Sequence, residues 1–348
     1  MSVPFPSSLP PARTPPSIDA PPLRWGILGT GWIARRFVGT MRQNTRQDVY
    51  AVGSRSLESA RAFAVDAGVE PAHCYGSYEE LVRDSEVDVV YVATPHHLHV
   101  EHALLSLSAG RNTFVEKPIG LNDAEVSRMT AAAAESGLFL REALWSAYLP
   151  KFDVIRQLLE AGVLGEVHTV QADCGEFFAP DHRILRADLA GGPLLDLGTY
   201  PIAFATWVLG PPVHVQAAGQ PHPAGVNGQL AAILADADGN QAVLHTTVFG
   251  ITPTTATIAG TRATLTLDGP FYQPGGFALR SADGEHELTW TEERVEHDAL
   301  HFEAAAVATC IAEGRLESPL RPLADSVATM AVMDEIRRRT GIVFPGGE

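Results

Sequence analysis

The sequence predicts an α/β protein in which a doubly wound parallel sheet is followed by a second α/β domain with a large mixed, mainly antiparallel open sheet. From residue 23 to about residue 145, short apolar strands alternate with helical patterns, which is typical of a parallel sheet with crossover helices. After about residue 149 apolar residues recur with period 2, which indicates strands with one exposed face. We therefore expect a Pro-rich flexible leader at 1–22 and two domains at 23–145 and 146–348.

The composition limits the function classes. The 348 residues include 41 acidic and 25 basic side chains, and the formal charge of −16 argues against non-specific binding to nucleic acid or anionic membranes. Three widely separated cysteines, Cys74, Cys174 and Cys310, suggest neither a disulfide framework nor a thiolate metal site. Because no stretch resembles a signal sequence or a membrane span, we expect a soluble cytoplasmic protein.

The elements of the first half follow a regular order. Residues 1–22 contain eight prolines and should be extended, as a disordered leader or, alternatively, as an arm on a partner subunit. Strands are expected near 23–28, 48–53, 73–75, 87–93, 112–115 and 138–141. Helices are expected near 32–43, 57–68, 77–84, 97–109 and 121–136.

The second half is expected to begin with a helix near 151–161. Strands should follow near 165–175, 213–220, 228–236, 241–249, 254–259 and 262–267. Helices near 195–209, 298–313 and 323–339 should cover one face of this sheet.

A glycine-rich turn, GTGWIA at 29–34, follows the first strand and opens a helix. In a G-x-G-x-x-A turn the first glycine makes the bend and the second lets a pyrophosphate approach the backbone amides. The placement predicts a Rossmann dinucleotide site that includes Gly29, Thr30, Gly31, Trp32 and Ile33. A loop with a structural role alone is the alternative.

The end of the second strand bears on the choice of dinucleotide. An NAD enzyme usually presents an acidic residue there to the ribose 2′-hydroxyl, but this chain has Ser54, Arg55 and Ser56. Guanidinium and hydroxyl groups suit a 2′-phosphate, so Ser54 and Arg55 favour NADP over NAD. The alternative for Arg55 is a solvated arginine at a helix start.

The strand near 87–93 ends in Thr94 and Pro95, followed by a cluster of histidines at 96, 97, 99 and 102. The i, i+3 spacing would place three of them on one helix face, but the pattern supplies no carboxylate or thiolate ligand at the same spacing, and we expect no metal. Thr94, Pro95 and His97 are predicted cofactor contacts and His96 a predicted substrate contact.

Lys117 stands between an apolar strand and Pro118. Proline favours an extended preceding residue, so Lys117 should lie at a strand's carboxyl end, where open parallel sheets bind ligands; Glu116 beside it is a predicted cofactor contact. Further along, Asp196 and Tyr200 are four residues apart and can share a helix face. With Lys117 they would make a proton relay for alcohol and carbonyl chemistry. A helix N-terminal charge and a core aromatic are the alternatives for Asp196 and Tyr200.

Taken together, these motifs resemble the glucose–fructose oxidoreductase/inositol dehydrogenase (Gfo/Idh/MocA) family over nearly all of the chain after residue 22. The similarity is closest to the branch of trans-dihydrodiol dehydrogenase and NADP-dependent D-xylose 1-dehydrogenase. The segments that carry it are 23–27, 75–81, 116–118, 142–145, 191–200 and 341–345.

The resemblance implies an NADP-dependent dehydrogenase that acts on the CH–OH groups of a sugar, cyclitol or trans-dihydrodiol. In relatives, the residues matching Lys117 and Tyr200 form the catalytic pair and the tryptophan matching Trp145 lines the substrate and nicotinamide pocket; Asp196 is expected to hold a substrate hydroxyl or Lys117. Ser59 stands where close relatives often have a second arginine, so use of NAD beside NADP is expected. Family analogy also implies a homodimer or homotetramer formed through the open sheet.

Three alternatives stay open at this point. A ketosugar reductase of a biosynthetic pathway would use the same residues in the opposite direction. A redox glycosidase or lyase would retain NAD and restore it within each turnover, and a nucleotide sensor would bind without catalysis. The sequence specifies neither the substrate nor the physiological direction.

Overall fold

The computed structural model describes residues 4–345, apart from the side chain of Glu296. Residues 1–3 of the predicted leader and 346–348 of the predicted second domain lie outside this range. The chain forms two compact units, each discontinuous in sequence. The parallel-sheet unit consists of Pro15–Tyr148 and Val295–Val327, and the mixed-sheet unit consists of the described parts of Met1–Thr14, Leu149–Arg294 and Ala328–Glu348. Their two sheets confirm the predicted fold class.

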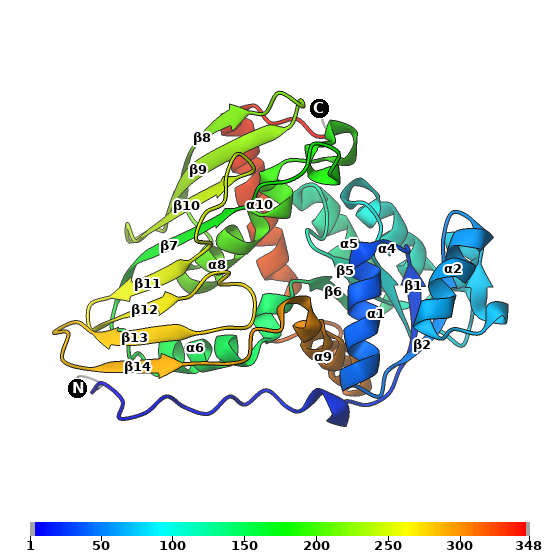
Figure 1. Ribbon diagram of the computed structural model, residues 1–348, viewed down its shortest axis with the longest axis horizontal. Coiled ribbons are helices and arrows are strands. Elements are labelled where there is room, and N and C mark those ends of the chain that lie inside the picture. The colour runs from blue at the N-terminus through cyan, green and yellow to red at the C-terminus, as the bar shows by residue number, and fades with distance from the viewer. Residues whose placement is uncertain (1–3, 346–348) are drawn as a thin grey trace. The chain divides into compact units, whose positions relative to one another are not determined.

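The parallel-sheet unit contains six parallel strands in the order β3-β2-β1-β4-β5-β6 (Figure 1). The strands are β1 (Arg24–Leu28), β2 (Asp48–Gly53), β3 (Cys74–Tyr75), β4 (Val89–Val92), β5 (Asn112–Glu116) and β6 (Leu140–Ala143). All four residues of β4 are buried, as expected for a strand covered on both faces. The strand order reverses between β1 and β4, and in such sheets ligands bind outside the carboxyl ends of the strands at this point.

Two groups of helices accompany this sheet. The helices α1 (Trp32–Asn44), α2 (Leu57–Ala67) and α9 (His301–Ala312) form one group, and α3 (Tyr78–Arg83), α4 (His99–Ser108) and α5 (Asp123–Ser136) form the other. Short 3₁₀ turns complete the unit: η1 (Ser17–Asp19), η2 (Pro71–His73), η3 (His96–Leu98), η4 (Trp145–Tyr148) and η7 (Glu296–Leu300). Side-chain caps begin several helices; Ser77 accepts the N–H of Glu80 at α3, and Asn122 accepts that of Glu125 at α5.

The mixed-sheet unit contains eight strands in the order β14-β13-β12-β11-β7-β10-β9-β8 (Figure 1). Neighbours are antiparallel except for β7 and β10, which are parallel. The strands are β7 (Val167–Gly175), β8 (His214–Pro221), β9 (Asn227–Ala235), β10 (Gln241–Thr247), β11 (Ala256–Gly260), β12 (Ala263–Leu267), β13 (Phe277–Ser281) and β14 (Glu287–Trp290). The helices are α6 (Pro150–Glu160), α7 (Pro193–Asp196), α8 (Thr199–Leu209) and the greater part of α10 (Leu323–Thr340), with η5 (Arg183–Leu185) and η6 (Ala187–Leu189). The residues of α10 up to Val327 belong to the parallel-sheet unit.

The two faces of the mixed sheet differ. The helix α8 packs on β7 and β10, and the side chains beneath it, such as Leu234 and Leu244, are buried. On the other face the paired residues Ile233 and Val243 are 41% and 44% exposed. The predicted association of subunits through this face stays a prediction.

The structure corrects three details of the second half. The helix expected near 298–313 to cover the second sheet is α9, which belongs to the parallel-sheet unit and packs against α1 and η4. The helix predicted over 195–209 is broken into α7 and α8, because the N–H of Gly198 bonds to the carbonyl oxygen of Pro193 at 2.7 Å and a Cβ on Gly198 would lie 2.5 Å from the oxygen of Leu194. Asp196 and Tyr200 therefore lie on separate helices rather than on one helix face. The strands β13 and β14 were not predicted, since they are short and carry exposed polar residues.

The Pro-rich segment is extended in the structure between residues 4 and 16. Within the mixed-sheet unit, the backbone N–H of Arg13 bonds to Asp153 Oδ2 at 2.6 Å, and Gln157 Nε2 donates to the carbonyl oxygen of Pro11 at 2.9 Å. The predicted flexibility of this leader stays a prediction. None of the helices within residues 4–345 combines the length and apolarity needed to cross a membrane.

A buried lysine fixes a loop of the mixed-sheet unit. Lys151 is fully buried in the first turn of α6, and its ammonium donates to the carbonyl oxygen of Gln273. Burial is the main reason why the pKa of Lys151 is lowered to about 8. The nearby Arg294 lowers it further, whereas Glu292 and Asp268 act in the opposite direction. The ammonium therefore holds the loop before β13 at a cost in stability.

We expect this cost to fall as the pH rises from about 8 to 10.5, because over this range the unfolded chain keeps a proton on Lys151 that the folded chain has lost. The contribution of Lys151 to the free energy of unfolding should rise across this range by about 3 kcal/mol in total. Urea unfolding of the wild type and of Lys151→Met, measured from pH 7.5 upwards, checks this through the difference between the two proteins. A difference that does not change with pH would contradict it.

Candidate active site

The glycine-rich turn follows β1 and leads into α1. Gly29 has φ of +98°, and a Cβ there would lie 2.6 Å from the carbonyl oxygen of Ala93, so only glycine fits. Gly31 is the N-cap of α1 and has an ordinary φ of −73°, yet no heavy atom of the described residues lies within 4 Å of where its Cβ would be. The helix N-terminus therefore opens on a space that a ligand can approach as closely as the backbone allows.

The segment after β2 is the predicted phosphate contact. Ser54 is buried, Arg55 is exposed, and Ser56 caps α2 by accepting the N–H of Ser59 at 3.2 Å. The hydroxyl of Ser56 is therefore engaged, which leaves the guanidinium of Arg55 as the main group suited to a phosphate.

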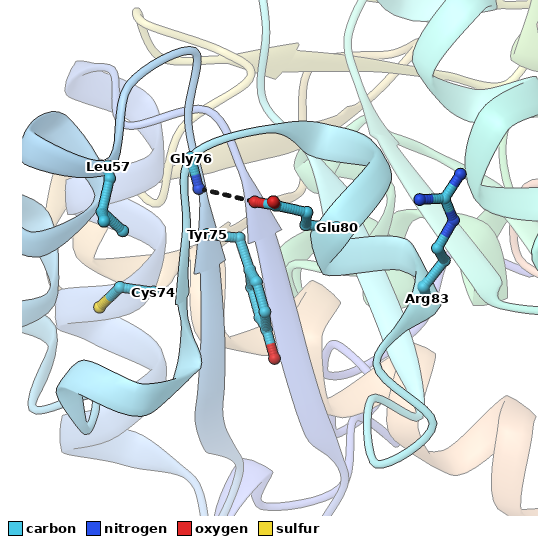
Figure 2. Close-up of a pocket in the computed structure, with 6 residues that line it drawn as sticks. All are labelled: Leu57, Cys74, Tyr75, Gly76, Glu80 and Arg83. Carbon is cyan, nitrogen blue, oxygen red and sulfur yellow. Dashed lines mark hydrogen bonds between the residues drawn. The ribbon is translucent and has the colours of Figure 1, made fainter.

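A pocket of about 600 Å³ begins one residue further on, at the start of α2 (Figure 2). It is lined by Leu57, Cys74, Tyr75, Gly76, Glu80 and Arg83. Glu80 accepts the N–H of Gly76 at 3.2 Å, and burial together with a bond to Asp84 raises the pKa of the Tyr75 phenol. None of the predicted site residues lines this pocket, which lies along the edge strand β3.

The loop after β4 contains Thr94 and the predicted histidines. Thr94 Oγ1 lies 2.9 Å from His102 Nδ1, and burial lowers the pKa of His102. His96 is buried, whereas His97 is half-buried and its Nδ1 has no hydrogen-bond partner among the described residues. Within residues 4–345, no cluster of three or more His, Cys, Asp or Glu side chains is arranged to hold a metal ion.

His99 joins this loop to the loop after β5. Its Nε2 lies 2.8 Å from the carbonyl oxygen of Thr94 and its Nδ1 lies 2.8 Å from that of Pro118. Because a carbonyl oxygen only accepts, a ring nitrogen that bonds to either oxygen must be the donor. This fully buried residue belonged to the histidine cluster of the sequence but was not predicted as a site residue.

Lys117 directly follows β5, at the carboxyl end predicted for it. Glu116 Oε2 accepts the backbone N–H of Lys117 at 3.1 Å, and its Oε1 accepts the phenol of Tyr91. Burial and the Glu116 carboxylate raise the pKa of Tyr91 well above its usual range, so the phenol stays a donor. The side chain of Glu116 is therefore used to shape the turn that carries Lys117.

An aromatic cluster adds a residue that sequence reasoning missed. The buried ring of Trp145, in η4, stacks on His297 of η7 with centroids 5.5 Å apart. His297 also contacts Trp32 of the glycine-rich turn, with ring centroids 4.8 Å apart and ring planes at 81°. His297 lies far from both tryptophans in sequence and had no motif to mark it.

The mixed-sheet unit holds Asp196 and Tyr200. Asp196 ends α7, is buried, and accepts a bond from Arg183 Nη2 at 2.9 Å. Tyr200 lies in the first turn of α8, where its ring stacks on Tyr272 with centroids 3.8 Å apart at 9°. Burial and the adjacent Tyr200 raise the pKa of Tyr272, so its phenol stays neutral. Arg183 and Tyr272 are thus the partners of the two predicted residues.

Comparison with known proteins covers both units. Residues 23–143 match the model of the GFO/IDH/MocA oxidoreductase family with an NAD-binding Rossmann fold, and residues 152–266 match the GFO/IDH/MocA C-terminal domain. The trans-1,2-dihydrobenzene-1,2-diol dehydrogenase of Xenopus tropicalis is 33% identical over 329 residues, or 92% of this chain and 99% of that protein. That of Bos taurus is 34% identical over 331 residues, or 93% of this chain and 98% of that protein.

Among solved structures, a 3-ketoreductase from Actinomadura kijaniata in complex with NADP and TDP-benzene superposes with a TM-score of 0.80. The two sequences are 26% identical, and the match covers 92% of this chain and 98% of that one. The family models, the relatives and the superposed structure all indicate oxidoreductases. The chain belongs to the Gfo/Idh/MocA family of oxidoreductases.

Proposed function

We propose that this protein is an NADP-dependent dehydrogenase or reductase that acts on a hydroxyl or carbonyl carbon of a sugar, cyclitol or trans-dihydrodiol. The observation that carries the proposal is the turn after β5, which fixes Lys117 at the ligand-binding edge of a doubly wound sheet. The names of the relatives support the reaction class and the range of substrates.

The residues present fit a dinucleotide. The open space at Gly31 suits a pyrophosphate at the N-terminus of α1, and His97 Nδ1 is a buried polar atom left for a ligand to satisfy. Arg55 would pair with a 2′-phosphate. When bound, the nicotinamide supplies the hydride acceptor or donor.

In the mechanism that we propose, Tyr200 Oη exchanges the proton of the substrate oxygen. The Lys117 ammonium orients that oxygen and stabilises the charge that develops on it and on the phenol. Trp145 would cover the reacting carbon and exclude water. Asp196, which accepts a bond from Arg183, would also accept a second substrate hydroxyl.

A ketosugar reductase is the second candidate, because the Actinomadura kijaniata structure is that of a 3-ketoreductase. A panel of trans-dihydrodiols, aldoses and ketosugars, assayed with both NADP and NADPH, separates the two directions. Product formed without net oxidation or reduction of the nicotinamide would instead indicate a retained cofactor.

The first variant test concerns the cradle at Gly31. Gly31→Ala should fold normally, because no described atom would meet the new methyl group, but should bind NADP at least about tenfold more weakly. Gly39→Ala is a matched control on the same helix, where an added Cβ is equally unopposed. Calorimetric titration with NADP and thermal unfolding measure the two effects. Equal affinity in both variants would contradict the site.

Arg55 tests the choice of dinucleotide. Arg55→Ala should raise the dissociation constant for NADP by roughly tenfold or more, since it removes a charge-assisted bond to the 2′-phosphate, and leave that for NAD unchanged. The exposed arginine Arg61, on α2, provides the control Arg61→Ala. If the two dinucleotides weaken in parallel, Arg55 does not recognise the 2′-phosphate.

The catalytic pair is tested by Lys117→Met and Tyr200→Phe. Each should lower kcat by on the order of 10³-fold, because each removes a group that acts on the substrate oxygen, while NADP binding survives. Tyr50→Phe, in β2, is a control for loss of a phenol elsewhere. Near-normal turnover of Lys117→Met with the best substrate of the panel would contradict the proposed mechanism.

A further inference from the structure

The turn that carries Lys117 is held by a carboxylate from the neighbouring strand. Glu142, in β6, directs Oε1 at the backbone N–H of Ile119, 3.3 Å away and two residues after Lys117. With the bonds from Glu116 to Lys117 and from His99 to Pro118, this is a third attachment of the turn. The position of the lysine therefore depends on where the Glu142 carboxylate points.

The other oxygen of Glu142 is bound to a segment far along the chain. Its Oε2 accepts bonds from Arg321 Nη2 at 2.8 Å, from Arg321 Nε at 3.0 Å and from Ser326 Oγ at 2.7 Å. The pair is buried, with 4% of the arginine side chain and 2% of the glutamate side chain exposed. Arg321 lies 179 positions after Glu142, within the same compact unit.

A buried carboxylate needs this partner. Without Arg321, Glu142 would be a buried charge with hydroxyl and amide donors alone, and its carboxylate would be driven to turn towards water. That rotation would take away the acceptor that holds Ile119. Another buried pair of this unit, Arg141 with Glu303, bonds β6 to α9 rather than to the turn, so it does not replace Arg321.

We propose that Arg321 is a positioning residue for Lys117: it holds the Glu142 carboxylate so that Oε1 stays aimed at Ile119, and the turn therefore presents the ammonium in one orientation. The inference rests on the proposed function, in which Lys117 acts on the substrate oxygen. A displacement on the order of 1 Å at a reacting group can cost about 100-fold in rate, which sets the size of the expected effect.

The test measures kcat, the KM for the sugar or diol substrate and the dissociation constant of NADP for Arg321→Met and Arg321→Lys. Arg321→Met should lower kcat by about 100-fold while NADP binding is unchanged, because the groups proposed to bind the cofactor stay in place. Arg321→Lys keeps the positive charge and should recover most of kcat. Arg24→Met, which breaks an ion pair with Asp88 before β4, is the control for loss of an arginine and should leave kcat unchanged.

Two double variants keep the test valid if Arg321→Met folds poorly. In both Glu142→Gln/Arg321→Met and Glu142→Leu/Arg321→Met, positions 142 and 321 carry no charge. Only glutamine keeps an acceptor for the backbone N–H of Ile119. The glutamine double variant should have the higher kcat of the two by at least about tenfold and should exceed Arg321→Met alone. Equal kcat in the two double variants, or wild-type kcat in Arg321→Met, would overturn the proposal. Normal turnover in Lys117→Met would instead overturn the proposed function on which it rests.

Discussion

The arrangement of the loops at the carboxyl edge of the parallel sheet depends on one buried imidazole. His99 binds the carbonyl oxygens of Thr94 and Pro118, and so joins the loops that follow β4 and β5. Loops at the edge of a sheet are ordinarily the mobile part of a fold. A hydrogen bond contributes about 0.5–1.5 kcal/mol to stability, and the contacts of one ring with both loops fix these loops relative to each other. His99 thus links the two loops directly, a link that a bound ligand would otherwise have to make.

The parallel-sheet unit contains more buried charge than stability alone would favour. Arg141 is 1% exposed, lies 3.5 Å above the centre of the Tyr148 ring and faces Glu303, whose pKa burial raises well above its usual range. Buried ion pairs often stabilise a fold no more than apolar residues of the same volume would. Buried carboxylates contribute to orientation here, because Glu116 accepts the backbone N–H of Lys117 and Glu142 accepts that of Ile119.

The sequence predicted the fold class because the signals were local. Proline after Lys117 and glycines after the first strand constrain their own neighbours, and the observed β5 and α1 begin and end close to the expected residues. What failed depended on distant contacts. The break at Gly198 depends on the close approach of the Leu194 carbonyl oxygen, which the local sequence does not indicate. The short strands β13 and β14 are strands because they pair with β12 and with each other. Arg321 and His297 carried no motif, because their partners Glu142 and Trp145 lie elsewhere in the sequence.

The discontinuity of the parallel-sheet unit has a consequence for how the protein is made. By residue 148 a growing chain contains all six strands of that sheet, yet Glu303 and Arg321 have not been synthesised. Arg141 and Glu142 would then be charges without their partners in a core that excludes water, which opposes early closure of the unit. Domains generally fold as units, the N-terminal one first during synthesis. This unit needs the partners Glu303 and Arg321, which follow the entire eight-stranded sheet in the sequence. In an incomplete polypeptide the turn that carries Lys117 therefore lacks one of its supports, which is added only once residue 321 has been synthesised.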